Sequence, residues 1–300
     1  MIIVGAGPAG LSAALILGRC RRRVLLCDTG QPRNAASHAL HGFLSRDGIQ
    51  PDELLRLGRE QLCKYESVEL RTIEVIDAVR DGKHFQVTFE DGTQLVSRKL
   101  LLATGVVDEL PAIEGLEVFY GRSVFHCPYC DGWEMRDAPL AIYGRGVRGR
   151  QLALELTVWS RDLVLCTDGP SKIEERDLNE LSRHGIAVRE ERILRLEGKD
   201  GILVRLVFVN GAELERRAML LCVHERQHSD LAAKLGCTFT QRTVRTGEYE
   251  QTDVPGLYVA GDASRRVQLA IVAAAEGAEA AFAINTALLK EDLAKDIERQ

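Results

Sequence analysis

The strongest constraint on the fold is a glycine pattern that occurs twice in the chain. The first copy, GAGPAG, covers residues 5–10, and the second, GRGVRG, covers residues 144–149, so equivalent positions such as 5 and 144 differ by 139. Each copy follows a short apolar run and precedes an apolar helical pattern. A second apolar run follows each helix, VLLC at 24–27 and LVLC at 163–166. This order is the strand–turn–helix–strand unit that binds dinucleotides, and two such units predict two α/β domains with parallel sheets.

The first unit carries the residues that hold a dinucleotide in such folds. Gly5 permits the tight turn, Gly7 lets the backbone approach a pyrophosphate, and Gly10 lets the helix pack on the strand. Asp28 ends the second apolar run, where a carboxylate accepts a hydrogen bond from a ribose hydroxyl. We expect the helix of this unit to end at Gly18, which would act as its C-terminal cap.

The second unit is less complete. The position that matches Asp28 is Thr167, and the acid of this unit, Asp168, comes one residue later, where a strand side chain faces the other way. Arg145 and Arg148 stand in a loop that is usually made of small residues. Two interpretations stay open, a weak NAD(P) site or a degenerate nucleotide fold that serves only as a scaffold. The glycines that would approach NAD(P) are Gly144, Gly146 and Gly149.

A CPYC sequence precedes the second unit and contributes Cys127 and Cys130. A structural zinc site would need further ligands at a set spacing, and the chain has no second CxxC pair. A redox pair fits better, because thiol–disulfide exchange needs one thiolate to attack and a second thiol to resolve the mixed disulfide. Asp131 is either a proton shuttle for the leaving thiolate or a helix cap. His126, if protonated, would favour a thiolate; the alternative is a turn residue without effect on catalysis.

Composition limits the location and the partners of the protein. The formal net charge of −5 and the pI of about 5.9 argue against binding to nucleic acid or to an anionic membrane surface. No uninterrupted apolar run reaches the roughly 18 residues that cross a bilayer. The start, MIIVGAG, lacks the basic segment and cleavage site of a signal peptide, so we expect a cytoplasmic protein. The other cysteines mostly lie in apolar runs and are expected to be buried free thiols: Cys20, Cys27, Cys63, Cys166, Cys222 and Cys237.

A third sequence motif that could contact a cofactor lies near the C-terminus. The sequence PGLYVAGD covers residues 255–262 and precedes an alanine-rich pattern that predicts a helix from about Leu269 to Leu289. A short strand would deliver Asp262 to the start of this helical region. There Asp262 would either hydrogen-bond a sugar-like hydroxyl, such as the ribityl chain of a flavin, or act as an N-terminal cap.

In chain order, these motifs resemble the low-molecular-weight thioredoxin reductases. The resemblance implies that the first unit binds FAD, that an inserted second unit binds NADPH and carries the cysteine pair, and that the protein is a homodimer. The matching motifs are GAGPAG at 5–10, ATG at 103–105, CPYCDG at 127–132, GRGVRG at 144–149 and VPGLYVAGDA at 254–263. We expect an FAD-binding domain over residues 1–115 and 225–300 and an inserted NAD(P)-type domain over residues 116–224.

The resemblance also implies roles for individual residues. Cys130 would lie beside the flavin, Cys127 would attack the substrate disulfide, and Asp131 would donate and accept the proton. The residues implied in FAD binding are Gly5, Gly7, Pro8, Ala9, Gly10, Asp28, Thr104, Gly105, Gly261, Asp262, Gln268 and Leu269.

Three positions depart from the family pattern. The arginine motif that recognises NADPH is absent after Cys166, and the glycine-and-proline hinge is replaced by residues 223–229. Gln268 and Leu269 replace the arginine–glutamine pair near the flavin ring. These changes leave FAD binding intact and leave the electron donor open between NADPH, NADH and a protein such as ferredoxin.

The leading hypothesis for the function is electron transfer between FAD, the Cys127/Cys130 pair and the disulfide of a thioredoxin-like protein or of a small molecule. One alternative is an FAD-dependent dithiol oxidase that forms disulfides with oxygen as the acceptor. Another is a flavin redox sensor without turnover. No metal is expected in any of the three.

Overall fold

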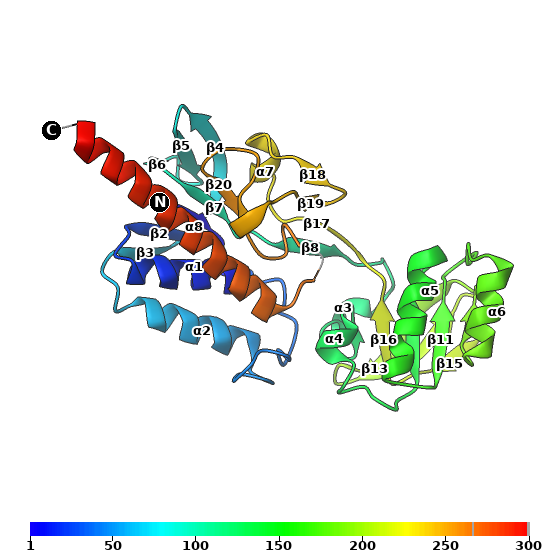
Figure 1. The fold of residues 1–300 in the computed structure, drawn as a ribbon. Helices are drawn as coiled ribbons and strands as arrows, with labels where there is room; N and C mark the ends of the chain where they lie inside the picture. The colour runs from blue at the N-terminus through cyan, green and yellow to red at the C-terminus, as the bar shows by residue number, and fades with distance from the viewer. Residues whose placement is uncertain (266, 299–300) are drawn as a thin grey trace. The chain divides into compact units, whose positions relative to one another are not determined.

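The computed structural model describes residues 1–265 and 267–298, and the chain divides into two compact units. Unit 1 comprises residues 1–35, 42–107 and 225–300, and unit 2 comprises residues 36–41 and 108–224. Each unit is built on a five-stranded parallel sheet. In Figure 1 the strands β2, β3, β7 and β20 mark the sheet of unit 1, and β11 and β16 mark that of unit 2. The α/β class and the two parallel sheets that the glycine repeat predicts are therefore confirmed.

The sheet of unit 1 has the strand order β20–β7–β1–β2–β3. Its strands are continuous apolar runs, as is usual for parallel strands that are covered on both faces. They are β1 (Ile2–Val4), β2 (Val24–Asp28), β3 (Val68–Thr72), β7 (Leu100–Leu102) and β20 (Leu257–Val259).

Different elements cover the two faces of this sheet (Figure 1). One face packs against three helices, α1 (Pro8–Arg19), α2 (Pro51–Leu62) and α8 (Ala270–Glu298). The other face packs against a short helix and an antiparallel sheet: α7 (Leu231–Lys234), β4 (Val75–Asp81), β5 (His84–Phe89) and β6 (Gln94–Ser97). The same unit contains a small hairpin, β18 (Phe239–Thr240) and β19 (Thr243–Val244), and the 3₁₀ turn η2 (Glu248–Glu250).

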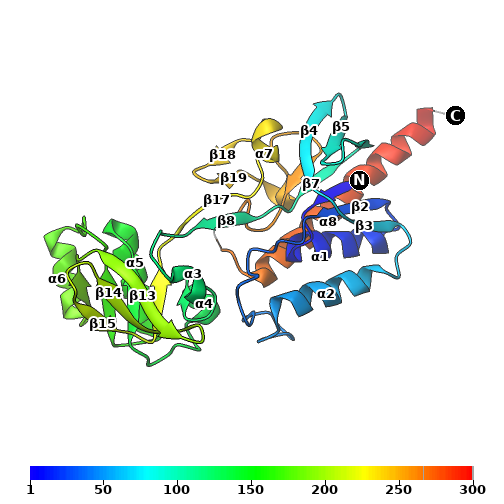
Figure 2. The same cartoon turned by 180° about the vertical axis from the view of Figure 1, so that it is seen from behind.

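The sheet of unit 2 has the strand order β12–β11–β10–β16–β9. Its strands are β9 (Val124–Phe125), β10 (Leu140–Tyr143), β11 (Leu163–Cys166), β12 (Ala187–Arg189) and β16 (Ala218–Leu221). Helices α5 (Gly146–Glu155) and α6 (Glu175–Arg183) cover one face, with the 3₁₀ turn η1 (Leu156–Val158). The other face packs on the antiparallel strands β13 (Ile193–Lys199), β14 (Ile202–Phe208) and β15 (Glu213–Glu215), which Figure 2 shows.

Two short helices and two connecting strands complete the fold. The helices α3 (Leu116–Phe119) and α4 (Pro128–Asp131) flank β9. Where the chain passes from one unit to the other, β8 (Val106–Glu109) and β17 (His224–Gln227) pair as a two-stranded sheet. The sequence that replaces the family hinge, residues 223–229, therefore contains a strand.

The expectation that Gly18 ends the first helix is wrong. Gly18 lies inside α1, which continues to Arg19, and Cys20 is its C-terminal cap. A Cβ on Gly18 would come within 2.8 Å of the Val68 side chain and 3.1 Å of the Tyr65 side chain. Glycine is therefore needed here because the segment before β3 packs directly on the helix.

The last helix, α8, runs beyond the expected end at Leu289 because charged residues anchor its final turns. Glu291 and Asp292 pair with the Arg98 guanidinium at 2.6 Å each, and Asp292 also pairs with Arg22 at 2.7 Å. These ion pairs tie the end of the helix to residues at the start of β2 and β7.

Among the described residues, α8 is also the one helix with the length and apolar composition of a membrane span. An 18-residue window within its segment Ala270–Ile297 has a mean hydropathy of 1.3. Ala280, Ala281 and Ile284 are fully buried in the core cluster that includes α1. Packing in the core of unit 1 therefore accounts for this buried part of the apolar surface of α8.

Candidate functional site

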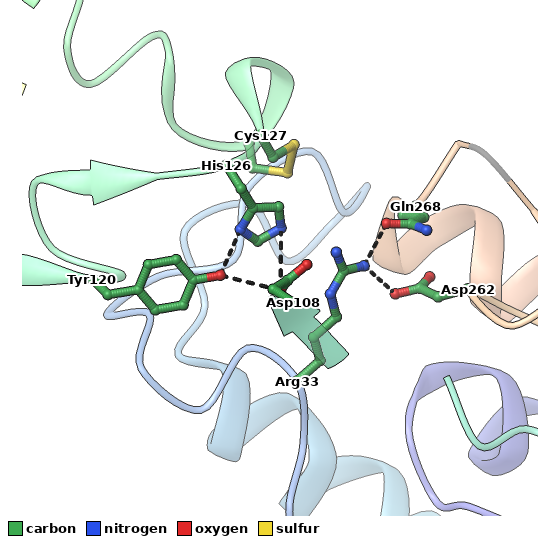
Figure 3. The surroundings of a disulfide bond; sticks show 8 residues. Arg33, Asp108, Tyr120, His126, Cys127, Asp262 and Gln268 are labelled. Atoms are coloured by element: carbon green, nitrogen blue, oxygen red, sulfur yellow. Dashed lines mark hydrogen bonds and ion pairs between the residues drawn. A yellow bond between two sulfur atoms is a disulfide. The ribbon is translucent and has the colours of Figure 1, made fainter. Parts of the chain in front are cut away.

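The two cysteines of the CPYC sequence form a disulfide at the start of α4 (Figure 3). Their Cα atoms are 5.3 Å apart, and Cys127 is the N-terminal cap of the helix. The Cys127 carbonyl accepts the backbone N–H groups of Cys130 (3.2 Å) and Asp131 (3.3 Å). Among the described residues, no group of three or more His, Cys, Asp and Glu side chains has the arrangement of a metal site. The arrangement fits a redox pair.

Asp131 is half-buried immediately beyond this disulfide. Its burial raises the pKa of the carboxyl group from 3.8 to about 7, and the negative charge of Glu134 contributes to this increase. A positive charge on His41 acts in the opposite direction. Asp131 is the last residue of α4 and so does not cap its N-terminus. A carboxyl group with this pKa can hold a proton at neutral pH and release it, as a general acid must.

His126, which precedes Cys127, is held by two side chains from other elements (Figure 3). The Tyr120 hydroxyl donates to Asp108 Oδ2 (3.1 Å) and lies 2.8 Å from His126 Nδ1. Because the single hydroxyl proton points to Asp108, we assign the proton of the second contact to Nδ1. His126 Nε2 is 3.9 Å from Asp108 Oδ2, so the carboxylate would stabilise a protonated imidazole.

Two large aromatic side chains beside the disulfide are exposed. Tyr129 is 68% exposed and Trp133 is 65% exposed. The Tyr129 and Trp159 rings pack in a T-shaped arrangement with their centroids 5.7 Å apart. The Arg136 guanidinium lies 4.2 Å from the centroid of the Trp133 ring. The surface around the cysteine pair is therefore partly aromatic.

The first glycine motif has the packing that a dinucleotide requires. A Cβ on Gly5 would overlap the Ala103 carbonyl oxygen, and a Cβ on Gly10 would overlap the Gly5 carbonyl oxygen. By contrast, nothing lies within 4 Å of a Cβ position on Gly7, at the N-terminus of α1. The strand and helix are therefore in close contact, and the backbone at Gly7, before Pro8 and Ala9, is open to a phosphate group.

Asp28 lies at the carboxyl end of β2, as the fingerprint predicts. One carboxylate oxygen accepts the Ala6 N–H (3.0 Å), and the other accepts the Gly30 N–H (3.2 Å) and the Arg59 guanidinium (3.0 Å). These contacts fix the carboxylate at the edge where the ribose of a dinucleotide binds in such units. The residues of this edge thus fit the adenosine diphosphate half of FAD.

Asp262 and Gln268 are brought together by a residue that the sequence did not indicate. Arg33 donates to Asp262 Oδ2 at 2.8 Å and to Gln268 Oε1 at 2.6 Å (Figure 3). Asp262 is not a cap of the last helix, which begins later, at Ala270, directly after Leu269. Its neighbour Gly261 donates its N–H to the buried Glu276 (2.8 Å). Asp262 is therefore held outside the helix by an ion pair, with its carboxylate at the end of β20.

Thr104 and Gly105 follow β7, next to the first glycine motif. The Gly105 carbonyl accepts the His228 N–H at 3.2 Å, which links this turn to the segment after β17. The carboxyl ends of β1, β2, β7 and β20 point to the same edge because these strands are parallel. Most residues implied in FAD binding follow one of these strands, so they gather at one edge of the unit 1 sheet.

The second glycine motif has a backbone similar to that of the first motif, but different side chains surround it. Gly144 and Gly149 are in close contact, and Gly146 adopts a positive φ of 56° at the start of α5. Arg145 donates to the Thr167 carbonyl oxygen and lies 3.4 Å from Asp168 Oδ2. The guanidinium therefore spans the carboxyl end of β11, where the sugar of a dinucleotide lies in such units.

The other residues of this edge are also engaged by protein groups. Asp168 Oδ1 accepts the Ile193 N–H at 2.8 Å. Arg148 donates to the Val223 carbonyl (2.6 Å) and contacts His224 Nδ1 (2.7 Å). Both arginines of the loop thus interact with unit 2 itself.

None of the six remaining cysteines forms a disulfide. Burial raises the pKa of Cys27 and Cys166 to about 12 and that of Cys237 to about 11, so these thiols stay protonated and inert. Cys20 and Cys63 are exposed, in contrast to the expectation of buried thiols, because both lie just beyond helix ends.

The fold and the disulfide define a class of protein, an oxidoreductase with two dinucleotide-type units and a redox cysteine pair. Residues 1–277 match the family described as pyridine nucleotide-disulphide oxidoreductase. A probable thioredoxin reductase of Arthroderma benhamiae is 30% identical over 296 residues, which cover 88% of this chain and 73% of that protein. The chain therefore belongs to this family, and it is an FAD-dependent oxidoreductase of the thioredoxin reductase type.

Solved structures agree with this assignment. A putative thioredoxin reductase, TrxB from Bacillus anthracis, matches with a TM-score of 0.92 at 34% identity, covering 97% of this chain and 98% of that one. The structure of HlmI matches with a TM-score of 0.95 at 36% identity, covering 99% of this chain and 95% of that one.

Proposed function

We propose that this protein moves electrons between FAD, the Cys127/Cys130 pair and a disulfide carried by a thioredoxin-like protein or a small molecule. The observation that carries the proposal is the cysteine pair with Asp131 directly beside it, a carboxyl group whose pKa is about 7. A disulfide with a proton donor of this strength is equipped for thiol–disulfide exchange. We further propose a cytoplasmic homodimer.

FAD binding is assigned to unit 1. When bound there, FAD would itself accept and donate pairs of electrons. The open backbone at Gly7 would receive its pyrophosphate, Asp28 its ribose and Asp262 its ribityl hydroxyls. The other residues proposed to line the site are Gly5, Pro8, Ala9, Gly10, Thr104, Gly105, Gly261, Gln268 and Leu269. We retain residues 1–115 and 225–300 as the FAD domain and residues 116–224 as the inserted domain.

The reduced cysteine pair would act through its own neighbours. A Cys127 thiolate attacks one sulfur of the substrate disulfide, and the other substrate sulfur leaves with the electron pair. Asp131 gives this sulfur a proton, and Cys130 then resolves the mixed disulfide. His126, held by Tyr120 and Asp108, favours the Cys127 thiolate when it is protonated.

A second function is favoured by the position of Arg145. Its guanidinium spans the edge of unit 2 where the sugar of NADPH or NADH would lie, next to Gly144, Gly146 and Gly149. If the edge is closed in this way, electrons enter from a protein donor such as ferredoxin or from a dithiol substrate. In the second case the protein is a dithiol oxidase that passes electrons to oxygen.

The cysteine chemistry is tested with two matched variants. Cys130→Ser removes the resolving thiol, whereas Cys63→Ser removes an exposed free thiol in unit 1. Both variants should retain FAD. Turnover of a disulfide or dithiol substrate should be lost in Cys130→Ser only, and unchanged turnover in that variant would contradict the proposal.

The direction of electron flow is tested separately. Oxygen uptake and hydrogen peroxide release are measured with a dithiol as the only reductant. Peroxide formed in proportion to the dithiol consumed supports the oxidase. Disulfide reduction with NADPH or NADH, without peroxide formation, supports the reductase.

A further inference from the structure

One guanidinium joins two residues of the segment between β20 and α8. Arg33 lies in the connection between β2 and α2, in a part that belongs to unit 1. It donates to Asp262 Oδ2 at 2.8 Å and to Gln268 Oε1 at 2.6 Å, as Figure 3 shows. Asp262 lies near the start of the segment, shortly after β20, and Gln268 lies near its end, shortly before α8. Arg33 therefore holds both ends of this segment to the connection.

The ion pair between Arg33 and Asp262 is largely shielded from solvent. The Arg33 side chain is 16% exposed and the Asp262 side chain is 21% exposed. Removal of two charges from water costs free energy, so a shielded pair is weak evidence for a contribution to stability. A guanidinium is planar and directs its N–H groups along fixed lines, so it limits the positions that a bound carboxylate can take. The pair therefore fits a role in positioning Asp262 better than a role in stability alone.

The turn that carries Asp262 packs on the helix of the first glycine motif. A Cβ on Gly261 would lie 3.2 Å from the Cβ of Ala9, in the first turn of α1. The Gly261 N–H donates to Glu276 Oε2 at 2.8 Å, and the Arg265 guanidinium donates to Glu276 Oε1 at 2.8 Å. The backbone beside Asp262 is thus fixed against α1 and α8, while Arg33 fixes its carboxylate.

This packing brings the Asp262 turn to the end of α1 that is open to a phosphate group. Gly7 is the N-terminal cap of α1, and no described residue beyond its chain neighbours has a heavy atom within 4 Å of its Cβ position. A ligand with its pyrophosphate at Gly7 would meet Asp262 with the groups beyond the pyrophosphate, which in FAD are the ribityl hydroxyls. A carboxylate can accept about four hydrogen bonds, so the Arg33 contact leaves it able to accept from a hydroxyl.

We propose that Arg33 is a positioning residue for FAD, which holds the Asp262 carboxylate in place to accept a ribityl hydroxyl. This inference rests on the FAD site of the proposed function. The same guanidinium fixes the amide of Gln268, because the amide oxygen accepts its N–H group. Arg33 should therefore matter for the part of FAD beyond the pyrophosphate. It should not matter for the adenosine diphosphate half, which the first glycine motif would bind.

The first experiment compares two ligands on the full chain freed of FAD. The Kd of FAD is measured by the change in flavin fluorescence, and the Kd of ADP by calorimetry. We expect Arg33→Met to raise the Kd of FAD at least about tenfold and to leave that of ADP unchanged within about twofold. Arg46→Met is the matched control and should change neither, because Arg46 is an exposed arginine of the same connection that donates to the Ser45 carbonyl. Equal losses of FAD and ADP affinity in Arg33→Met, or no loss of either, would overturn the inference.

A double variant tests whether Arg33 acts through Asp262. Asp262→Asn alone should also weaken FAD binding. Arg33→Met should have little further effect in that background, because two residues that act as one unit do not contribute independently. Losses of FAD affinity that multiply in the double variant would show that the two residues act separately, and the inference would fail.

The outcomes distinguish this inference from the proposed function. If the wild-type protein binds FAD and exchanges disulfides but its FAD affinity does not respond to Arg33, only the inference fails. If the wild-type protein binds no FAD, the proposed function fails as well. The ADP affinity of each variant also establishes that unit 1 is folded, because Gly7 and Asp28 both lie in this unit.

Discussion

The raised pKa of Asp131 predicts that this residue reduces the stability of the folded protein at neutral pH. In the unfolded chain the carboxyl group titrates at about 3.8, and in the folded protein at about 7. Well below pH 3.8 the group is protonated in both states and does not change the free energy of unfolding. As the pH rises toward 7, the unfolded chain releases the proton and the folded protein keeps it, so stability falls. The shift of about three units corresponds to about 4 kcal/mol.

Asp131→Asn replaces the carboxyl group by a neutral group of the same shape. We expect this variant to be more stable than the wild type by up to about 4 kcal/mol at pH 8, where the carboxyl group is ionised in both states. The difference should decrease below pH 7 and approach zero near pH 4. Asp137→Asn, which changes an exposed aspartate of the same unit, is the control and should show no such dependence.

Urea unfolding followed by tryptophan fluorescence measures this difference. The chain has two tryptophans, both in unit 2. The Trp159 ring lies against Gly132 and the Tyr129 ring, directly beside the site of the substitution. A stability gain of equal size at pH 4 and pH 8, or no gain at pH 8, would refute the reasoning, because ionisation of Asp131 would then not be its cause.

Three further predictions follow from the contacts of the site. Tyr120→Phe removes the hydroxyl between His126 and Asp108, so the pH midpoint for alkylation of Cys127 in the reduced protein should rise; an unchanged midpoint would show that His126 does not act on this thiol. Arg145→Ala opens the edge of unit 2, so NADPH affinity measured by calorimetry should increase at least severalfold; equal affinity in both proteins would mean that Arg145 does not close the edge. Gly7→Ala should unfold like the wild type but retain less FAD after gel filtration, whereas Gly10→Ala should lose stability, because only the second Cβ would meet protein atoms. Full FAD retention in Gly7→Ala would contradict the proposed pyrophosphate position.

The parts of the fold that depend on local sequence could be predicted. The glycine motifs, the apolar runs and the acid at Asp28 lie within about thirty residues of each other, and each constrains the backbone of its own unit. The redox pair could also be predicted from the sequence, because two residues between the cysteines place their sulfur atoms within bonding reach. The class of the fold and the cysteine chemistry therefore follow from short-range patterns.

The parts that depend on contacts between distant segments could not be predicted. Tyr120, at the C-terminal cap of α3, and Asp108, in β8, reach His126, and His41 reaches Glu134 from the connection after β2. None of these pairings has a fixed spacing in the sequence. The length of the connection between Asp28 and Pro51 was the one available signal, since long loops in compact domains are often functional.

The same limit applies to the arginines and to Gly18. Arg33 and Arg145 were visible as charges, but their partners Asp262 and Thr167 became evident only in the folded chain. Gly18 looked like a helix cap because it follows an apolar helical run, and the packing of the segment before β3 determines its actual role.

An anaerobic titration of the FAD-loaded protein with dithiothreitol, followed at the flavin absorbance band, tests the central claim most directly. We predict that the dithiol bleaches the band in the wild type and in Cys63→Ser, and that Cys130→Ser stays oxidised because the path through the cysteine pair is broken. Bleaching of equal extent in Cys130→Ser, or none in the wild type while dithionite bleaches it, would contradict electron transfer between the flavin and Cys127/Cys130.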